Sequence, residues 1–270
     1  MNDAQRLGRE AAVAASRVGD HPWLERLARL GFVASGLIHL LIGWIAARVA
    51  LGGSGDQADQ SGALESLREA PGGAVLLWVC VVGFAALALW QAIEALVGAD
   101  ELTDRAKAVG KAVLYGALGA TTLVFALGGS KDSEETSTDL TATLLELPWG
   151  RFLVGAVGLG VLGAGAFHVY RGWSRSFLDD LVGTGGGTVG KGVEVSGVVG
   201  FVAKGIALGV MGVLFLVAAL RADPEEASGL DGALRTLAEQ PLGTWLLLAV
   251  ALGLVLYGVY SFARARYDRF

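Results

Sequence analysis

The chain has 270 residues, of which 53% are hydrophobic and 17% are charged, and its mean hydropathy is +0.55. These values exclude an ordinary soluble domain and favour a protein whose solvent is the lipid bilayer. The formal net charge of -5 disfavours a nucleic-acid partner, and the single cysteine, Cys80, excludes an internal disulfide.

Six apolar stretches follow one another along the chain, and each is long enough to cross a bilayer. A spanning helix needs roughly 20 mostly apolar residues. The stretches are 30–51, 74–97, 109–127, 152–171, 198–220 and 242–263. The 29 residues before the first stretch lack the apolar core of a secretory signal, so we expect the first span to insert uncleaved. Within them, residues 4–18 predict either an interfacial helix or a solvated segment.

The basic residues predict which side of the membrane each loop occupies. With both termini in the cytoplasm, fifteen of the 21 Lys and Arg residues fall on the inner side. The three outer segments, 52–73, 128–151 and 221–241, then carry fourteen acidic residues. Because short cytoplasmic loops are enriched in basic residues, the sequence predicts a multi-pass protein of the cell membrane with both termini cytoplasmic.

Internal repeats are the strongest signal in the chain. Residues 31–36 recur at 200–205, residues 62–67 recur at 232–237, and a more diverged copy follows the first by 77 residues. These copies divide the chain into a cytoplasmic N-terminal segment (1–22), repeat 1 (23–98), repeat 2 (105–178), a glycine-rich linker (179–195) and repeat 3 (196–270).

Each repeat predicts a helix, an acidic outer loop, a short amphipathic helix, a Pro-x-Gly turn and a second helix. Proline lacks an amide proton and restricts the residue before it, so the short helix ends there. Two spans per repeat bring every copy into the membrane from the same side. The predicted fold is an all-α membrane protein of six transmembrane helices, arranged as three parallel two-helix repeats in a pseudo-threefold bundle. Its glycines are expected to let the helices pack closely.

The repeated motifs resemble a known family. The opening Arg-x-Gly-Phe-Val-Ala-x-Gly at 29–36, present in part at 200–205, is followed by Ala-Leu-x-x-Leu and Pro-x-Gly. This pattern is similar to domain-of-unknown-function family 1206, bacterial membrane proteins built from three two-helix repeats. The resemblance covers nearly the whole chain from Trp23 onward, although the middle copy departs from the motif at 109–113. It implies the fold and supplies no activity.

Ionisable groups inside the predicted spans are functional candidates, because charge is costly in hydrocarbon. His39 lies ten residues after Arg29, or about 15 Å along a helix, near the bilayer centre. It is either a hydrogen-bonded histidine between helices or a proton or ligand site. Lys204 is expected to snorkel to the inner interface, with Glu194 and Ser196 within reach.

Overlaying the second helix of each repeat aligns an aromatic, a polar and a charged set. One interpretation is an interfacial aromatic belt with snorkelling arginines, one of which pairs with Glu94. The other is that the polar set faces the axis and forms the inner mouth of a pathway. The sets are Trp90, Phe167 and Tyr260, then Gln91, His168 and Ser261, then Glu94, Arg171 and Arg264.

Phosphate, metal and catalytic motifs are absent or incomplete. Residues 185–191 fit G-x-x-x-x-G-K, but Gly192 follows where Ser or Thr would hold magnesium, so a flexible linker is preferred. Only three histidines exist, and His39 and His168 are predicted at different depths. The sequence therefore predicts no metal, no cofactor and no enzymatic activity.

Two function classes stay open. The leading hypothesis is a non-catalytic bundle that holds a lipid-like molecule, or a membrane partner, against its glycine-rich faces. The alternative is a small channel or transporter with an axial pathway through His39 and the polar set. Membrane lipids are the expected partners, and a homo-oligomer or another membrane protein is a further option.

Overall fold

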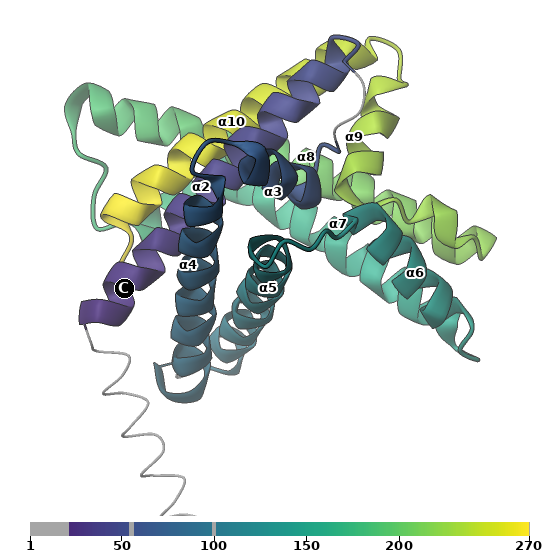
Figure 1. Ribbon diagram of the computed structural model, residues 1–270, viewed down its shortest axis with the longest axis horizontal. Coiled ribbons are helices and arrows are strands. Elements are labelled where there is room, and N and C mark those ends of the chain that lie inside the picture. Colours follow the sequence, from purple (N-terminus) through teal and green to yellow (C-terminus); the bar gives the residue numbers. More distant parts are fainter. Residues whose placement is uncertain (1–21, 54–56, 99–100, 270) are drawn as a thin grey trace, which may run out of the picture.

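The computed structural model describes residues 22–53, 57–98 and 101–269, and six long helices dominate it (Figure 1). Each is long and apolar enough to cross a membrane, which confirms the six predicted spans of a multi-pass protein. The predicted interfacial helix at residues 4–18 lies outside the described residues. The long helices are α2 (Pro22–Ala50), α4 (Gly73–Ile93), α5 (Leu102–Ala126), α7 (Gly150–Ser174), α8 (Gly187–Arg221) and α10 (Gly243–Tyr267); the π-helix η1 (Glu94–Gly98) continues α4.

Three short helices, one in each repeat, precede the second long helix: α3 (Gln60–Glu69), α6 (Ser133–Leu145) and α9 (Gly229–Ala238). The turn after each short helix needs a glycine. A Cβ atom on Gly73, Gly150 or Gly243 would stand 1.9–2.0 Å from a carbonyl oxygen of the short helix. This contact explains why the glycine of the Pro-x-Gly element recurs in all three copies.

The long helices pack side by side in a row, and the two ends of this row are the two spans of repeat 2. Helix α2 packs on both α4 and α10, α8 packs on both α10 and α7, and α5 packs on α4. Across the described residues α5 and α7, the two spans of repeat 2, do not pack against each other. Figure 1 shows them diverging, with α4 and α5 on one side and the α7–α8 pair on the other. The predicted pseudo-threefold arrangement therefore has one open seam.

Glycines bring several helix pairs into backbone contact, as predicted. A Cβ on Gly83 would stand 2.5 Å from the Gly31 nitrogen, joining α4 to α2. A Cβ on Gly165 would stand 2.7 Å from the Gly205 carbonyl oxygen, joining α7 to α8. Because lipid tails are as apolar as leucine, such close approach is what holds membrane helices together.

Two glycines of α8 form a matched pair that tests this packing. A Cβ on Gly212 would lie 2.6 Å from the backbone nitrogen of Leu162 in α7, whereas a Cβ on Gly209 would meet nothing within 4 Å. We expect Gly212→Ala to destabilise the protein by about 1–3 kcal/mol through overpacking. Gly209→Ala is expected to be neutral or stabilising by up to about 1 kcal/mol, because alanine favours the helix. Thermal unfolding in detergent measures both, and equal effects would contradict this packing.

The glycine-rich linker is shorter than predicted. Residues 176–180 form the 3₁₀ helix η2 (Ser176–Asp180), and α8 already begins at Gly187, so only residues 181–186 connect them. The amide of Val182 donates to the Tyr267 carbonyl at 2.8 Å, and the amide of Arg269 donates to the Asp180 carbonyl at 2.8 Å. The connection is therefore fixed to the C-terminal end of α10 and is not a free linker.

Candidate functional site

A polar cluster lies among the helices where α2, α8 and α10 meet. Lys204, at the midpoint of α8, donates from Nζ to His39 Nε2 of α2 at 3.2 Å. The same ammonium group lies 4.2 Å from the ring centroid of Tyr257 on α10, and the His39 and Tyr257 rings are 4.6 Å apart. Lys204 therefore points toward His39. The expectation that it snorkels to the inner interface is wrong.

The hydrogen bonds of His39 determine how it meets Lys204. His39 Nδ1 is 2.7 Å from the Ser35 carbonyl oxygen, an acceptor, so Nδ1 carries the proton. The tautomer follows from this network, and it leaves the Nε2 lone pair to accept from Lys204. His39 is thus a neutral, hydrogen-bonded histidine that orients the lysine.

Lys204 has no carboxylate partner within ion-pair distance among the described residues. Glu194, one expected neighbour, is 2.5 Å from Arg175, and Ser196 donates to the Val193 carbonyl. An ammonium group carries three donors, and here one is used by His39 and one side is covered by Tyr257. A cation in this setting is costly unless something else pairs with it.

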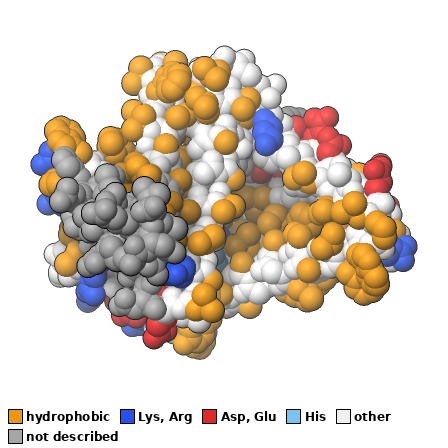
Figure 2. Space-filling view, turned by 90° about the horizontal axis from the view of Figure 1, so that it is seen from below, with side chains coloured by type: hydrophobic (Ala, Val, Ile, Leu, Met, Phe, Trp, Pro, Cys, Tyr) orange, Lys and Arg blue, Asp and Glu red, His pale blue; other side chains and the backbone are white. Residues whose placement is uncertain are grey.

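The cluster faces the inside of the helix assembly and is nevertheless partly exposed. Ile206 is 42% exposed and marks the outer side of α8; Lys204, two residues earlier, lies about 200° around the helix from it. Lys204 and His39 are both of intermediate exposure. Figure 2 shows the molecule hollowed, with hydrophobic side chains along the hollow.

His168 belongs to the edge of the same region. Its Nδ1 donates to the Ala164 carbonyl at 2.8 Å, and its ring is 5.7 Å from that of Phe201. Phe201 in turn contacts Tyr257 at 5.2 Å between centroids, so aromatic rings connect His168 to the cluster. His168 and His39, which the sequence predicts at different depths, are therefore connected through the rings of Phe201 and Tyr257.

A charged cavity of about 240 Å³, called the inner cavity below because the sequence predicts that this end faces the cytoplasm, lies at the C-terminal end of α10. Arg264 donates from Nε to Asp268 at 2.9 Å, and Arg171 donates to Asp180 at 2.6 Å. Burial raises the pKa of Asp268, although Arg264 opposes this shift. The cavity is lined by Phe32, Leu87, Trp90, Gln91, Lys111, Asp179, Asp180, Arg264, Asp268 and Arg269.

The two predicted groupings of the second helices are not formed. Glu94 is exposed and makes no ion pair in the described part of the chain, because Arg171 and Arg264 are paired with aspartates of the inner loops. Gln91 lines the inner cavity. Ser261 is buried and donates to the carbonyl of Tyr257 in its own helix, and His168 lies on Phe201. The polar set thus does not converge on one mouth.

An apolar groove of about 670 Å³ runs between α7 and α8 at their outer ends. Its walls are side chains of Phe152, Gly155, Ala156, Leu159, Leu216, Ala219 and Leu220, and Arg151 stands at its end. Trp149, 70% exposed, precedes α7 at the same level. Exposed tryptophan and arginine at a helix end are typical of the lipid headgroup region.

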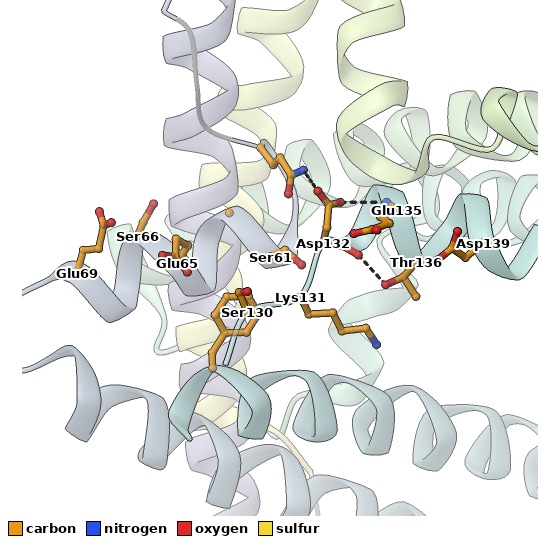
Figure 3. Close-up of a pocket in the computed structure, with 13 residues that line it drawn as sticks. Ser61, Glu65, Ser66, Glu69, Ser130, Lys131, Asp132, Glu135, Thr136 and Asp139 are labelled. Atoms are coloured by element: carbon orange, nitrogen blue, oxygen red, sulfur yellow. Dashed lines mark hydrogen bonds between the residues drawn. The ribbon is translucent and has the colours of Figure 1, made fainter. Parts of the chain in front are cut away.

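An acidic pocket of about 630 Å³ lies between α3 and α6 (Figure 3). Glu65 and Glu69 come from α3, and Asp132, Glu135 and Asp139 come from α6 and its start, with Lys131 beside them. Within the described residues, no three acidic, histidine or cysteine side chains are placed to hold a metal ion.

Below this pocket the outer segments of all three repeats are hydrogen-bonded together. Gln57 donates to Asp132 at 2.7 Å, and the amide of Ala58 donates to Asp231 of α9 at 2.7 Å. Asp59 caps α3 by accepting from the Gly62 amide, while its other oxygen, Oδ2, is buried without a partner. Burial raises the pKa of Asp59 to about 6, and the neighbouring Asp231 adds to the shift.

Sequence reasoning missed several residues of these sites. Tyr257 carries no signal, because one tyrosine in an apolar span is ordinary. Asp180 reads as a loop acid, and only the fold brings it to Arg171, whereas Asp268 lies four residues after Arg264, a helical spacing that the sequence could have revealed. Asp59 reads as a helix cap, which it is, but its burial depends on α9.

Comparisons with known proteins agree with the repeats. The DUF1206 family, described as Domain of Unknown Function, matches residues 30–98, 106–175 and 199–268. A Bacillus subtilis (strain 168) protein, described as Uncharacterized protein YxxB, is 29% identical over 260 residues, which is 92% of each chain. No solved structure matches the chain. The three family matches correspond to the pairs α2–α4, α5–α7 and α8–α10.

Proposed function

The chain belongs to the DUF1206 family, and from this premise we propose that it is a non-catalytic membrane bundle that binds a lipid-like molecule. The observation that carries the proposal is the groove between α7 and α8. Its volume of about 670 Å³ is in the range of ligand sites, and its walls are apolar. Arg151, at the start of α7, is positioned to meet a polar head while an apolar chain lies along the groove.

The orientation belongs to the same proposal. Basic residues concentrate at the inner ends of the helices, and the outer segments are acidic, which supports cytoplasmic termini and a place in the cell membrane. The groove then opens to the outer leaflet, where membrane lipids are the partners.

The alternative, a channel or transporter with an axial pathway, has less support. It needs a continuous polar path, and of Gln91, His168 and Ser261 only Gln91 lines the inner cavity. Phe201, Tyr257 and Tyr260 are buried, and their rings contact one another. A proton or ion path would have to pass this aromatic group.

Two glycine variants test the groove. A Cβ on Gly155 would lie 3.8 Å from that of Ala219, an ordinary contact, so Gly155→Leu fills the groove without forcing the helices apart. Gly160, on the same helix, has nothing within 4 Å and lies outside the groove. We expect native mass spectrometry from lipid nanodiscs to detect a retained apolar molecule on the wild type and on Gly160→Leu.

For Gly155→Leu we expect occupancy to fall by about tenfold, about 1.4 kcal/mol of binding free energy, because the leucine side chain takes space that the ligand would fill. No retained molecule on the wild type, or equal retention by the two variants, would reject the groove. A doubled protein mass with a bare groove would point to a homo-oligomer.

A further inference from the structure

We propose that Lys204, held between His39 and Tyr257, is a binding site for an anionic oxygen group, a carboxylate or a phosphate. This site is separate from the α7–α8 groove, and the proposal does not depend on it. It rests on the geometry of the lysine, the lack of a counter-ion and the partial exposure of Lys204 and His39.

The geometry prepares the ammonium group to bind. His39 is fixed by its bond to the Ser35 carbonyl and accepts one Lys204 proton at 3.2 Å. Tyr257 covers another side of the group at 4.2 Å. At least one donor remains free, and a charge-assisted bond to an anionic oxygen is the strongest contact it can make.

The protein itself supplies no anion at this place. Glu194, on the same helix as Lys204, is paired with Arg175, and Asp268, just after α10, is bound by Arg264 at 2.9 Å. No other carboxylate of the described residues pairs with Lys204. A cation kept in an apolar interior without a partner costs free energy that a bound anion would recover.

The ligand can reach the lysine. Lys204 and His39 are both partly exposed, so the cluster is not sealed from its surroundings. Beyond Lys204, the same side of α8 carries Leu208, Met211 and Phe215, all of intermediate exposure. These apolar side chains suit the chain of an amphipathic ligand, and a small free anion is the other source of the same chemistry.

The test compares the full-length wild type with Lys204→Met, Lys204→Gln and Lys204→Arg. Lys204→Gln removes the charge but keeps a donor for His39, so it guards against a folding defect in Lys204→Met. Lys191→Met is the control, because Lys191 is an exposed lysine of the same helix. One arm follows thermal unfolding in an uncharged detergent with added inorganic phosphate or octanoate. The other follows lipid retention from nanodiscs containing phosphatidylcholine and phosphatidylglycerol.

We expect the wild type, Lys204→Arg and Lys191→Met to bind the anion, and the neutral variants to bind it at least about tenfold more weakly. Stabilisation by phosphate or octanoate identifies a free anion as the ligand, and selective retention of phosphatidylglycerol identifies a lipid headgroup. The proposal is overturned if neither arm distinguishes wild type from the neutral variants, or if Lys191→Met loses binding equally. Retention of uncharged lipid alone would leave the α7–α8 groove intact and reject this site.

Discussion

Asp268→Asn is expected to destabilise the detergent-solubilised protein by about 1–3 kcal/mol, less than the cost of leaving a buried charge with no partner, because Arg264 keeps Asp180 at 3.8 Å. Asp268 is 6% exposed and accepts from Arg264 at 2.9 and 3.2 Å through two oxygens. Asparagine keeps one acceptor and the size of the side chain, but it leaves the guanidinium with only the more distant Asp180. Burial raises the pKa of Asp268 and so works against its charge; the expected cost comes from Arg264, which loses its closer partner, and the melting temperature in detergent is the direct readout.

Glu94→Gln is the matched control for this prediction. Glu94 also lies at the inner end of a span, but it is exposed and forms no ion pair within the described residues. Its removal should leave the melting temperature unchanged. A loss of stability in Glu94→Gln, or no loss in Asp268→Asn, would show that Asp268 is not the partner that stabilises Arg264.

Asp59→Asn is expected to stabilise the protein above pH 6 and to leave it unchanged near pH 4. The pKa of Asp59 is raised by burial to about 6 from its ordinary 3.8, so the folded state prefers the protonated form. Stability from this group is therefore fully present below about pH 4 and is lost as the pH rises through 6, a difference of about 3 kcal/mol. Asparagine is always neutral, and it keeps the oxygen that accepts from Gly62.

Asp132→Asn should behave in the opposite way. Although desolvation opposes it, hydrogen bonds from the Glu135 amide, Gln57 and the Glu134 amide lower the pKa of Asp132. Its contribution is present at neutral pH and is lost as the pH falls, so the variant should be less stable than wild type at pH 7.5. Melting temperatures of both variants at pH 4.5 and 7.5 test the pair, and parallel pH profiles would argue against the buried carboxylate.

The six spans, the short outer helices and the repeats were predictable because each rests on local properties. Apolar length specifies a span, and Pro-x-Gly specifies a turn that only glycine fits. The open seam was not predictable, because equivalent glycines have unequal surroundings. Gly83 touches the backbone of Gly31, and Gly253 touches Ala203, yet Gly160 at the same repeat position has nothing within 4 Å.

The polar sites show a similar limit. The sequence gives the height of Lys204 along its helix but not the direction of its side chain. His39, which sets that direction, is 165 residues away. The pairing of Glu94 with an arginine was wrong because both arginines pair with aspartates that follow them in the chain: Arg171 with Asp180, nine residues on, and Arg264 with Asp268, four residues on.

The packing of the helices also determines the order in which they can find their neighbours while the protein is being synthesised. Helix α5 finds its neighbour α4 as soon as it is made, but α7 must wait for α8, because it does not pack on α5. Helix α2, the first span, is finally covered by α10, the last, and Arg29 then donates to the Ala265 carbonyl at 2.8 Å. A nascent chain stopped after repeat 2 would leave the glycine-lined side of α7 bare in the bilayer. Chaperones or proteases that recognise unfinished membrane proteins would have that surface to act on until α8 is inserted.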